Sequence, residues 1–281
     1  MPKVWLITGS SRGLGRALAE AVAASGDELV ATARNVESLA GLGGEHVALD
    51  VTDPEAARAA VAFAVERFGR LDVVVNNAGY ADLGSIEEMP PEVFDAQIAT
   101  NFFGVVNVTR AALPVLRAQR SGHFIQVSTA GGRNAYPGQS AYHASKFAVE
   151  GFSESLAKEV APLGVNVTIV EPGGFRTDWA GSSMHTYPAH EDYAESVGAM
   201  MALIHGNGHN PVGDPAKAAR VIVEVAGMKE PPLRLPLGSD ASALIRAGDE
   251  ARIAEIDRWR ELSLSTDADD AVPFDPAVLP A

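Results

Sequence analysis

Tyr142 and Lys146 are four residues apart, and on a helix this spacing places the phenol and the ammonium group on one face. A free tyrosine has a pKa of about 10 and is seldom a base at neutral pH. A cation about 4 Å away, at an effective dielectric constant near 20, contributes about 4 kcal/mol, which lowers a pKa by about three units. The pair is therefore a candidate acid/base device, although the same spacing is also common on solvated helix surfaces.

A second candidate site is the glycine-rich stretch at residues 8–15, which reads TGSSRGLG and follows an apolar run. Glycine there permits a tight turn and lets backbone N–H groups approach a phosphate at a helix N-terminus. The stretch also fits the G-x-S-x-G pattern of serine hydrolases, but that site needs an oxyanion loop earlier in the chain, and only eight residues precede Gly9. A dinucleotide pyrophosphate is the favoured ligand.

The residue at the end of the second strand distinguishes the two nicotinamide cofactors. An acidic residue there would accept hydrogen bonds from a free ribose 2′-hydroxyl, whereas an arginine would pair with a 2′-phosphate. The chain has Ala33 followed by Arg34, with Arg12 in the glycine-rich stretch. This favours NADP(H) over NAD(H). The alternative is that both arginines are solvated surface charges.

The elements that must hold these groups alternate between strand and helix. The pattern predicts an α/β fold, a Rossmann-type doubly wound parallel sheet in a single domain at residues 1–265. Within it, residues 178–213 form a variable substrate lid of short helices or a flap, and residues 266–281 form a C-terminal tail on the surface or against another subunit. Apolar runs predict strands at residues 4–7, 28–32, 46–49, 73–75, 124–127 and 166–170. Helices are expected at residues 13–25, from Pro54 to near Gly69, after Pro215, and at residues 94–116 and 142–160.

Composition excludes several classes of protein. The 281 residues carry a net charge of −14, which opposes binding to nucleic acid or to an anionic membrane. The chain has no cysteine, so it has no disulfide, no thiolate metal site and no thiol nucleophile. No apolar run is long enough to cross a membrane, and the first residues run straight into a strand, so we expect no signal peptide and a cytoplasmic location.

Seven motifs occur in one order along residues 3–180. They are Thr8-Gly9-x-x-x-Gly13-x-Gly15, Asp50-Val51, Asn76-Asn77-Ala78-Gly79, Asn101, Ser128-Thr129, Tyr142-x-x-x-Lys146 and Pro172-Gly173-x-x-x-Thr177. In these motifs and their order the chain resembles the short-chain dehydrogenase/reductase family. Within that family, the sequence at residues 131–133 and 147–152 is most similar to the branch of 17β-hydroxysteroid and retinol dehydrogenase-like enzymes.

The resemblance implies a role for each matching residue. Tyr142 would exchange a proton with the substrate oxygen, Lys146 would lower the pKa of the phenol and bind ribose hydroxyls, and Asn101 would hold a water of the proton relay. With Thr129, these are the expected catalytic residues. Asn76 would pack beside the adenosine. The expected cofactor contacts, including the two arginines above, are Gly9, Ser11, Arg12, Gly13, Leu14, Gly15, Arg34, Asp50, Val51, Asn77, Ala78, Gly79, Tyr142, Lys146, Pro172, Gly173, Phe175 and Thr177.

One position departs from the family pattern. The serine that orients the substrate carbonyl usually lies thirteen residues before the tyrosine, which here is Thr129. If the strand continues through Ser128 and Thr129, their side chains point to opposite faces and only one can address the substrate. Thr129 is favoured, and a shifted loop that presents Ser128 is the alternative.

The lid carries Trp179, Met184, Tyr187, Met200 and Met201, which predicts an apolar pocket. His205 and His209 invite a metal site, but the intervening glycines disfavour one, so no metal is expected. Apolar residues on the segments 94–116 and 142–160 predict a homodimer or homotetramer. We therefore expect an NADP(H)-dependent oxidoreductase that transfers a hydride to or from a hydrophobic ketone, aldehyde or alcohol, steroid-like or retinoid-like. The alternative is an idle NADP(H)-binding regulatory protein.

Overall fold

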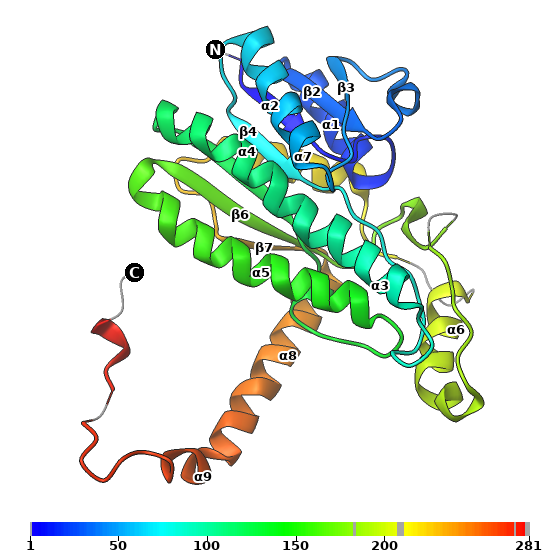
Figure 1. The fold of residues 1–281 in the computed structure, drawn as a ribbon, viewed down its shortest axis with the longest axis vertical. Helices are drawn as coiled ribbons and strands as arrows, with labels where there is room; N and C mark the ends of the chain where they lie inside the picture. The colour runs from blue at the N-terminus through cyan, green and yellow to red at the C-terminus, as the bar shows by residue number, and fades with distance from the viewer. Residues whose placement is uncertain (1, 182–183, 207–210, 273, 279–281) are drawn as a thin grey trace.

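The computed structural model describes residues 2–181, 184–206, 211–272 and 274–278, and it centres on one sheet of seven parallel strands (Figure 1). The strand order is β3-β2-β1-β4-β5-β6-β7, so the order reverses between β1 and β4. This doubly wound arrangement confirms the predicted fold class, and it places the ligand crevice beyond the carboxyl ends of the strands at the reversal. The strands are β1 Val4–Ile7, β2 Glu28–Ala33, β3 Glu45–Ala48, β4 Val73–Asn76, β5 Gly122–Val127, β6 Val165–Pro172 and β7 Arg234–Leu237.

Helices cover both faces of the sheet. α1 (Gly13–Ser25) and α7 (Pro215–Val225) pack on one face, and α2 (Pro54–Phe68), α4 (Gly104–Gln119) and α5 (Ser140–Val160) cover the other (Figure 1). Two apolar clusters, one per face, make the core, and every residue of β1 and β4 is buried. The shorter helices and the last long one are α3 Pro91–Ile98, α6 Ala199–His205, α8 Ser239–Arg258 and α9 Arg260–Leu264.

Helix ends follow the sequence signals closely. Asp53 and Asp214 cap α2 and α7 by accepting from backbone N–H groups of the first turn, and a proline follows each cap. α1 and α2 both end at a glycine in the left-handed conformation, with φ of 83° at Gly26 and 77° at Gly69.

Three elements differ from the prediction. The single helix expected at residues 94–116 is α3 and α4 joined by a π-helical turn, Ala99–Phe103. β7 and α8 were not predicted. β7 is short and contains Pro236, and α8 is charged on much of its surface, so neither shows the apolar periodicity that marks the other elements.

The lid region contains no strand within its described residues, 178–181, 184–206 and 211–213. Short helical turns and α6 make up much of it, as expected. Its apolar residues Met184 and Ile204 are buried against Leu83 and Tyr142 of the main body. None of the helices in the described part of the chain is long and apolar enough to cross a membrane.

Candidate active site

Tyr142 and Lys146 lie in the first half of α5 and share one face of it, at the carboxyl ends of β4 and β5. Both are buried, with 8% and 4% of their surface exposed. The Lys146 Nζ atom lies 5.9 Å from the centre of the Tyr142 ring and donates to the Val127 carbonyl at 2.7 Å. The pair is therefore an internal one and not part of a solvated helix surface.

Burial disfavours both the phenolate of Tyr142 and the ammonium of Lys146, and the resulting pKa of the phenol differs from the sequence prediction. Burial raises the pKa of Tyr142 to about 12, against which a hydrogen bond with Thr129 acts. Burial also lowers the pKa of Lys146 to about 8, against the charge of Glu150. The phenol pKa is therefore raised and not lowered as the sequence predicts, because desolvation disfavours the phenolate. At neutral pH the phenol holds its proton, as a proton donor must.

The two candidate hydroxyls face in different directions. The Thr129 hydroxyl interacts with the Tyr142 phenol and donates to the Pro172 carbonyl at 3.1 Å. Ser128 is buried on the other side, where it interacts with the carboxyl group of Glu150. The geometry therefore places Thr129 at the phenol.

Asn101 lies in the π-helical turn between α3 and α4. Its side-chain oxygen accepts from the Tyr80 N–H at 3.0 Å, and its amide donates to the Tyr80 carbonyl at 2.8 Å and to Ser145 at 3.1 Å. A Cβ atom added at Gly79 would lie 3.0 Å from the Asn101 oxygen and 3.6 Å from the Lys146 nitrogen. Asn101 and Lys146 thus flank the same glycine, and the four expected catalytic residues gather at one place.

The glycine-rich loop between β1 and α1 has the shape of a phosphate cradle. Gly9 and Gly13 have φ of 67° and 58°, a conformation that side chains disfavour, and a Cβ atom at Gly15 would collide with the Gly9 carbonyl and the Asn77 amide. Arg12 occupies the N-cap of α1 and makes no side-chain cap there, so the first N–H groups of the helix are left for an anion. The loop therefore fits a dinucleotide pyrophosphate.

Asn77 supports this loop from behind. Its amide donates to the carbonyls of Thr8 at 2.9 Å and Gly9 at 3.1 Å. The side chain of its neighbour Asn76 was expected beside the adenosine, but it lies elsewhere. The Asn76 amide is buried and donates to Thr109 at 3.1 Å and Gln126 at 2.9 Å, inside the fold. The expected contact of Asn76 with adenosine is wrong, because its side chain points away from the crevice.

At the far end of the crevice, Arg34 is exposed directly after β2. Burial acts to raise the pKa of Asp50, but hydrogen bonds from Thr52 and, to a smaller degree, the charge of Arg34 lower it below its ordinary value. Val51 is buried, and its side chain lies against Gly104. Arg12 is half exposed and lies 3.8 Å from Asp178 of the lid. The structure thus holds Arg34 at the expected position, and Arg12 between the loop and the lid.

The segment after β6 closes the crevice on its other side. Thr177 lies beside Gly13, at 3.6 Å from a Cβ atom added there, and Phe175 pairs with Gly213 of the lid in a short parallel bridge. Gly173 has no room for a side chain, because the carboxylate of Asp240 occupies that space. Ser11, Leu14, Ala78 and Pro172, also expected to contact the cofactor, are half buried along the same crevice.

Asp240, in the first turn of α8, is a residue that sequence reasoning missed. It accepts from the Gly174 N–H at 2.7 Å, and its other oxygen is buried with no hydrogen-bond partner among the described residues. It therefore fixes the backbone beside the expected nicotinamide contacts. The available signal in the sequence was an acidic residue, Asp240, two positions after Gly238.

A second missed feature is a partly buried group of charges next to the loop that follows Thr129. Arg133 donates to Glu171 at 3.2 Å and to Asp249 of α8, and Arg234 of β7 lies 3.3 Å from Glu150. Glu171 is fully buried, and burial raises its pKa to about 7, aided by the charge of Glu150. The group links the loop after Thr129, the end of β6 and α8.

The lid provides an apolar wall over the phenol. The Trp179 and Tyr142 ring centres lie 5.6 Å apart, and Met200 and Met201 pack partly buried in the same cluster. Of the lid histidines, His205 bonds to Thr186 at 2.9 Å, and His209 lies outside the described residues. The described ranges contain no group of three or more histidine, aspartate or glutamate side chains that could hold a metal ion.

Comparisons with known proteins agree with this geometry. Residues 3–188 match the family model described as short chain dehydrogenase. The chain is 49% identical over 273 residues to the oxidoreductase BOA17 of Botryotinia fuckeliana, covering 95% of this chain and 100% of that protein. The crystal structure of a short-chain dehydrogenase from Streptomyces avermitilis has a TM-score of 0.88 at 41% identity, covering 95% of this chain and 98% of that one. A short-chain dehydrogenase from Burkholderia cenocepacia, solved with NADP, has a TM-score of 0.73 at 26% identity, covering 92% and 97%.

Proposed function

The chain belongs to the short-chain dehydrogenase family of oxidoreductases, and on this basis we propose that it is an NADP(H)-dependent carbonyl reductase or alcohol dehydrogenase acting on a hydrophobic substrate. The observation that carries the proposal is the buried pair Tyr142 and Lys146, with Thr129 beside the phenol, beneath an apolar lid. Ketones and aldehydes with an apolar body, steroid-like or retinoid-like, are the substrates that suit this pocket.

The cofactor contacts divide along the crevice. The N-terminus of α1 and the glycine loop would hold the pyrophosphate, Arg34 would pair with a 2′-phosphate, and the segment 172–177 would hold the nicotinamide end. A bound nicotinamide supplies or accepts the hydride. The relative from Burkholderia cenocepacia binds NADP, and this supports the same choice of cofactor here.

The chain's own residues handle the proton. Tyr142 is protonated at neutral pH, so it donates a proton to the carbonyl oxygen as a general acid. Lys146, mostly cationic at neutral pH with a pKa of about 8, stabilises the negative charge that develops on the phenol oxygen. The Thr129 hydroxyl, beside the phenol, orients the carbonyl. The lid excludes water from these groups, which strengthens each interaction.

The test is NADPH consumption, followed by absorbance, over a panel of ketones, aldehydes, quinones and steroids. With a substrate found, Tyr142→Phe should lower kcat/KM by about 10²- to 10⁴-fold, because the variant lacks the proton to donate. NADPH affinity, measured by fluorescence titration, should stay within a few-fold. Turnover by Tyr142→Phe equal to that of the wild type contradicts the acid/base role. NADPH binding without turnover of any carbonyl assigns the protein instead to the regulatory alternative.

Two further expectations from the sequence remain proposals. A cytoplasmic location is one. The other is self-association, for which the structure offers exposed aromatic residues, Phe103 on the turn before α4 at 53% exposed and Phe147 on α5 at 44%. Light scattering of the purified chain tests association directly.

A further inference from the structure

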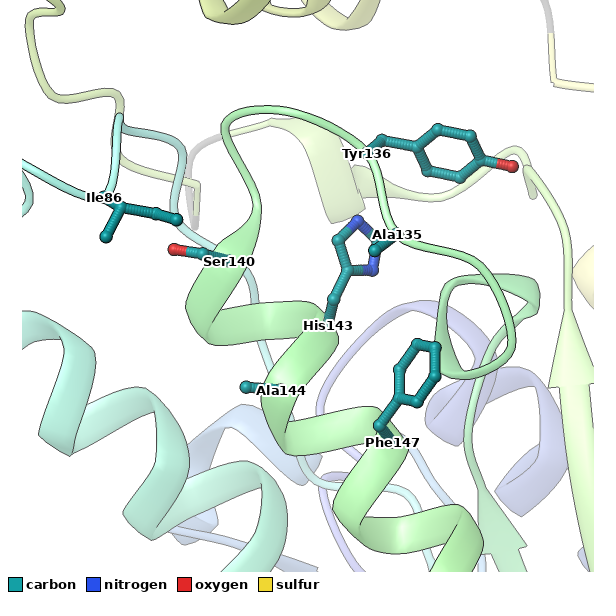
Figure 2. A pocket seen from close by; sticks show the side chains of 7 residues that line it. All are labelled: Ile86, Ala135, Tyr136, Ser140, His143, Ala144 and Phe147. Atoms are coloured by element: carbon teal, nitrogen blue, oxygen red, sulfur yellow. The ribbon is translucent and has the colours of Figure 1, made fainter. Parts of the chain in front are cut away.

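His143 follows Tyr142 directly on α5, and the two side chains serve different surroundings. Tyr142 lies at the centre of the proposed site, whereas the imidazole of His143 contacts the loop that joins β5 to α5. Figure 2 shows the ring in the wall of a pocket, turned toward the part of this loop that carries Ala135 and Tyr136. His143 is 4% exposed, and its ring centre lies 5.7 Å from that of Tyr136 and 5.8 Å from that of Tyr142. The imidazole is therefore an internal group held between two aromatic rings.

His143 bonds to the backbone of Gly131. Its Nδ1 atom lies 2.8 Å from the Gly131 carbonyl oxygen, and because a carbonyl only accepts hydrogen bonds, Nδ1 carries the proton. Nε2 is then the unprotonated nitrogen, and it is buried with no hydrogen-bond partner among the described residues. Burial lowers the pKa of His143, against the hydrogen bond with Gly131, which raises it. At neutral pH the ring is thus a neutral donor at Nδ1.

Gly131 connects this ring to Thr129. The Gly131 N–H donates to the Thr129 hydroxyl oxygen at 3.2 Å. A Cβ atom added at Gly131 would lie 2.8 Å from the Cε1 and Nδ1 atoms of His143 and 3.3 Å from the Cγ2 methyl of Thr129. The Gly131 backbone is therefore packed between the imidazole and the threonine side chain, with a hydrogen bond to each, and the site leaves no room for a larger residue.

The hydrogen bonds of the Thr129 hydroxyl give this connection a chemical consequence. A hydroxyl has one proton and accepts through two lone pairs. The Gly131 N–H occupies one lone pair, and the proton is donated to the Pro172 carbonyl at 3.1 Å. One acceptor position is left for the Tyr142 phenol, which interacts with this hydroxyl. Rotation about the Cβ–Oγ1 bond turns the proton from Pro172 toward a bound carbonyl, and the oxygen itself stays in place as long as Gly131 holds it.

We propose that His143 is a positioning residue of the reaction: it fixes the Gly131 peptide, and this peptide holds the Thr129 oxygen where it orients the substrate carbonyl. The inference rests on the proposed function, and it gives His143 a role that needs no contact with substrate or cofactor. Loss of the donor at residue 143 leaves the buried Gly131 carbonyl without its partner, so the loop shifts to find another. A displacement of about 1 Å at a reacting group can lower a rate by about 100-fold.

Three side chains at residue 143 test this role. His143→Leu lacks the donor and should lower the kcat of carbonyl reduction about 10-fold, with the KM of NADPH within a few-fold of the wild type, because the expected cofactor contacts lie elsewhere. His143→Asn places an amide N–H where histidine has Nδ1–H and should recover most of the kcat. Equal kcat for His143→Leu and the wild type overturns the proposal, and so does a His143→Asn variant as slow as His143→Leu.

Ser140→Ala is the matched control for these variants. Ser140 lies one turn before His143 on α5, and its buried hydroxyl has no hydrogen-bond partner in the described part of the chain. Its removal should leave kcat unchanged. A loss of kcat equal to that of His143→Leu means that any change on this face of α5 slows the reaction, and it overturns the specific role of the imidazole.

A double-mutant cycle separates an effect through Thr129 from a general loss of packing. Thr129→Val has no hydroxyl to position, so His143→Leu should lower kcat little further in that background. A combined loss close to that of Thr129→Val alone is the expected result. A combined loss equal to the product of the two single losses means that His143 acts independently of Thr129, and it overturns the proposal.

A measurement on the wild-type chain without substrate tests the geometry by itself. Long-range ¹H–¹⁵N spectra of the full chain, assigned by comparison with His143→Asn, should show a neutral ring protonated at Nδ1 at about pH 7. A ring protonated at Nε2 has no donor for Gly131 and overturns the proposal. A wild type that reduces no carbonyl of the panel contradicts the proposed function and this inference with it. Turnover by the wild type with an unaffected His143→Leu variant contradicts this inference alone.

Discussion

The indole of Trp179 lies over the phenol of Tyr142, with ring centres 5.6 Å apart and ring planes inclined by 58°. Its neighbour Asp178 faces Arg12 of the glycine loop at 3.8 Å. Two adjacent lid residues therefore touch the two halves of the proposed site, the proton donor and the phosphate cradle. An apolar substrate that reaches Tyr142 must pack against Trp179 or displace it.

Trp179→Ala should raise the KM of a hydrophobic carbonyl about 10- to 100-fold, because loss of an apolar contact costs about 1–3 kcal/mol, and change kcat much less. Trp179→Phe retains a ring and should recover most of the affinity. Steady-state kinetics over a series of substrates of increasing chain length measure the effect. A KM that is independent of residue 179 means that Trp179 does not contact the substrate.

The second prediction concerns the hydroxyl beside the phenol. Thr129→Ser should keep kcat/KM within a few-fold, whereas Thr129→Val, which has a similar shape but no hydroxyl, should lower it by about 10- to 100-fold. Ser128→Ala should have little effect on kcat/KM, because Ser128 faces Glu150. Should Ser128→Ala be the damaging change and Thr129→Val the neutral one, the loop presents Ser128 during catalysis.

The sequence predicted the first six strands because each contains a short apolar run between helical segments. β7 and α8 escaped prediction for a physical reason. Both are held by contacts with distant residues: β7 pairs with β6, and Ala241 and Ile245 of α8 are buried against Ala130. A residue pattern within one segment does not reveal such contacts.

The grouping of Tyr142, Lys146, Asn101 and Thr129 could be anticipated, because their spacing matches a known family. The pKa values of Tyr142 and Lys146 could not be anticipated. A spacing of four residues predicts proximity, but the pKa of Tyr142 is set mainly by burial beneath a lid whose packing the sequence does not specify. Asn76 shows the same limit, since its position at the end of β4 does not tell which face its side chain occupies.

The third prediction tests the choice of cofactor. Arg34→Asp should raise the KM of NADPH about 10- to 100-fold, the loss of one charge-assisted contact with a 2′-phosphate, and leave the KM of NADH unchanged or lower. Arg220→Asp, an exposed arginine on α7, makes the same change of charge elsewhere and should affect neither cofactor. An equal loss for both cofactors with Arg34→Asp contradicts the phosphate contact.

The last prediction concerns Glu171. Burial raises the pKa of its carboxyl group from an ordinary value of 4.5 to about 7. The charge of Glu150 adds to this rise, and the charges of Arg133 and Arg234 oppose it. Between these two pH values the folded protein holds a proton that the unfolded chain has lost. Unfolding then releases a proton, so this group makes the free energy of unfolding fall as the pH rises. At about 1.4 kcal/mol per pKa unit, the full effect is about 3 kcal/mol.

Glu171→Gln cannot titrate but retains an oxygen that accepts from Arg133, so its free energy of unfolding should fall less than that of the wild type between about pH 5 and pH 8. Urea unfolding across this range measures the difference. Glu154→Gln is the matched control, because Arg234 lowers the pKa of Glu154 and any stability it contributes is lost only at more acidic pH. Parallel curves for Glu171→Gln and the wild type mean that Glu171 is already ionised in the folded protein, balanced by its two arginines.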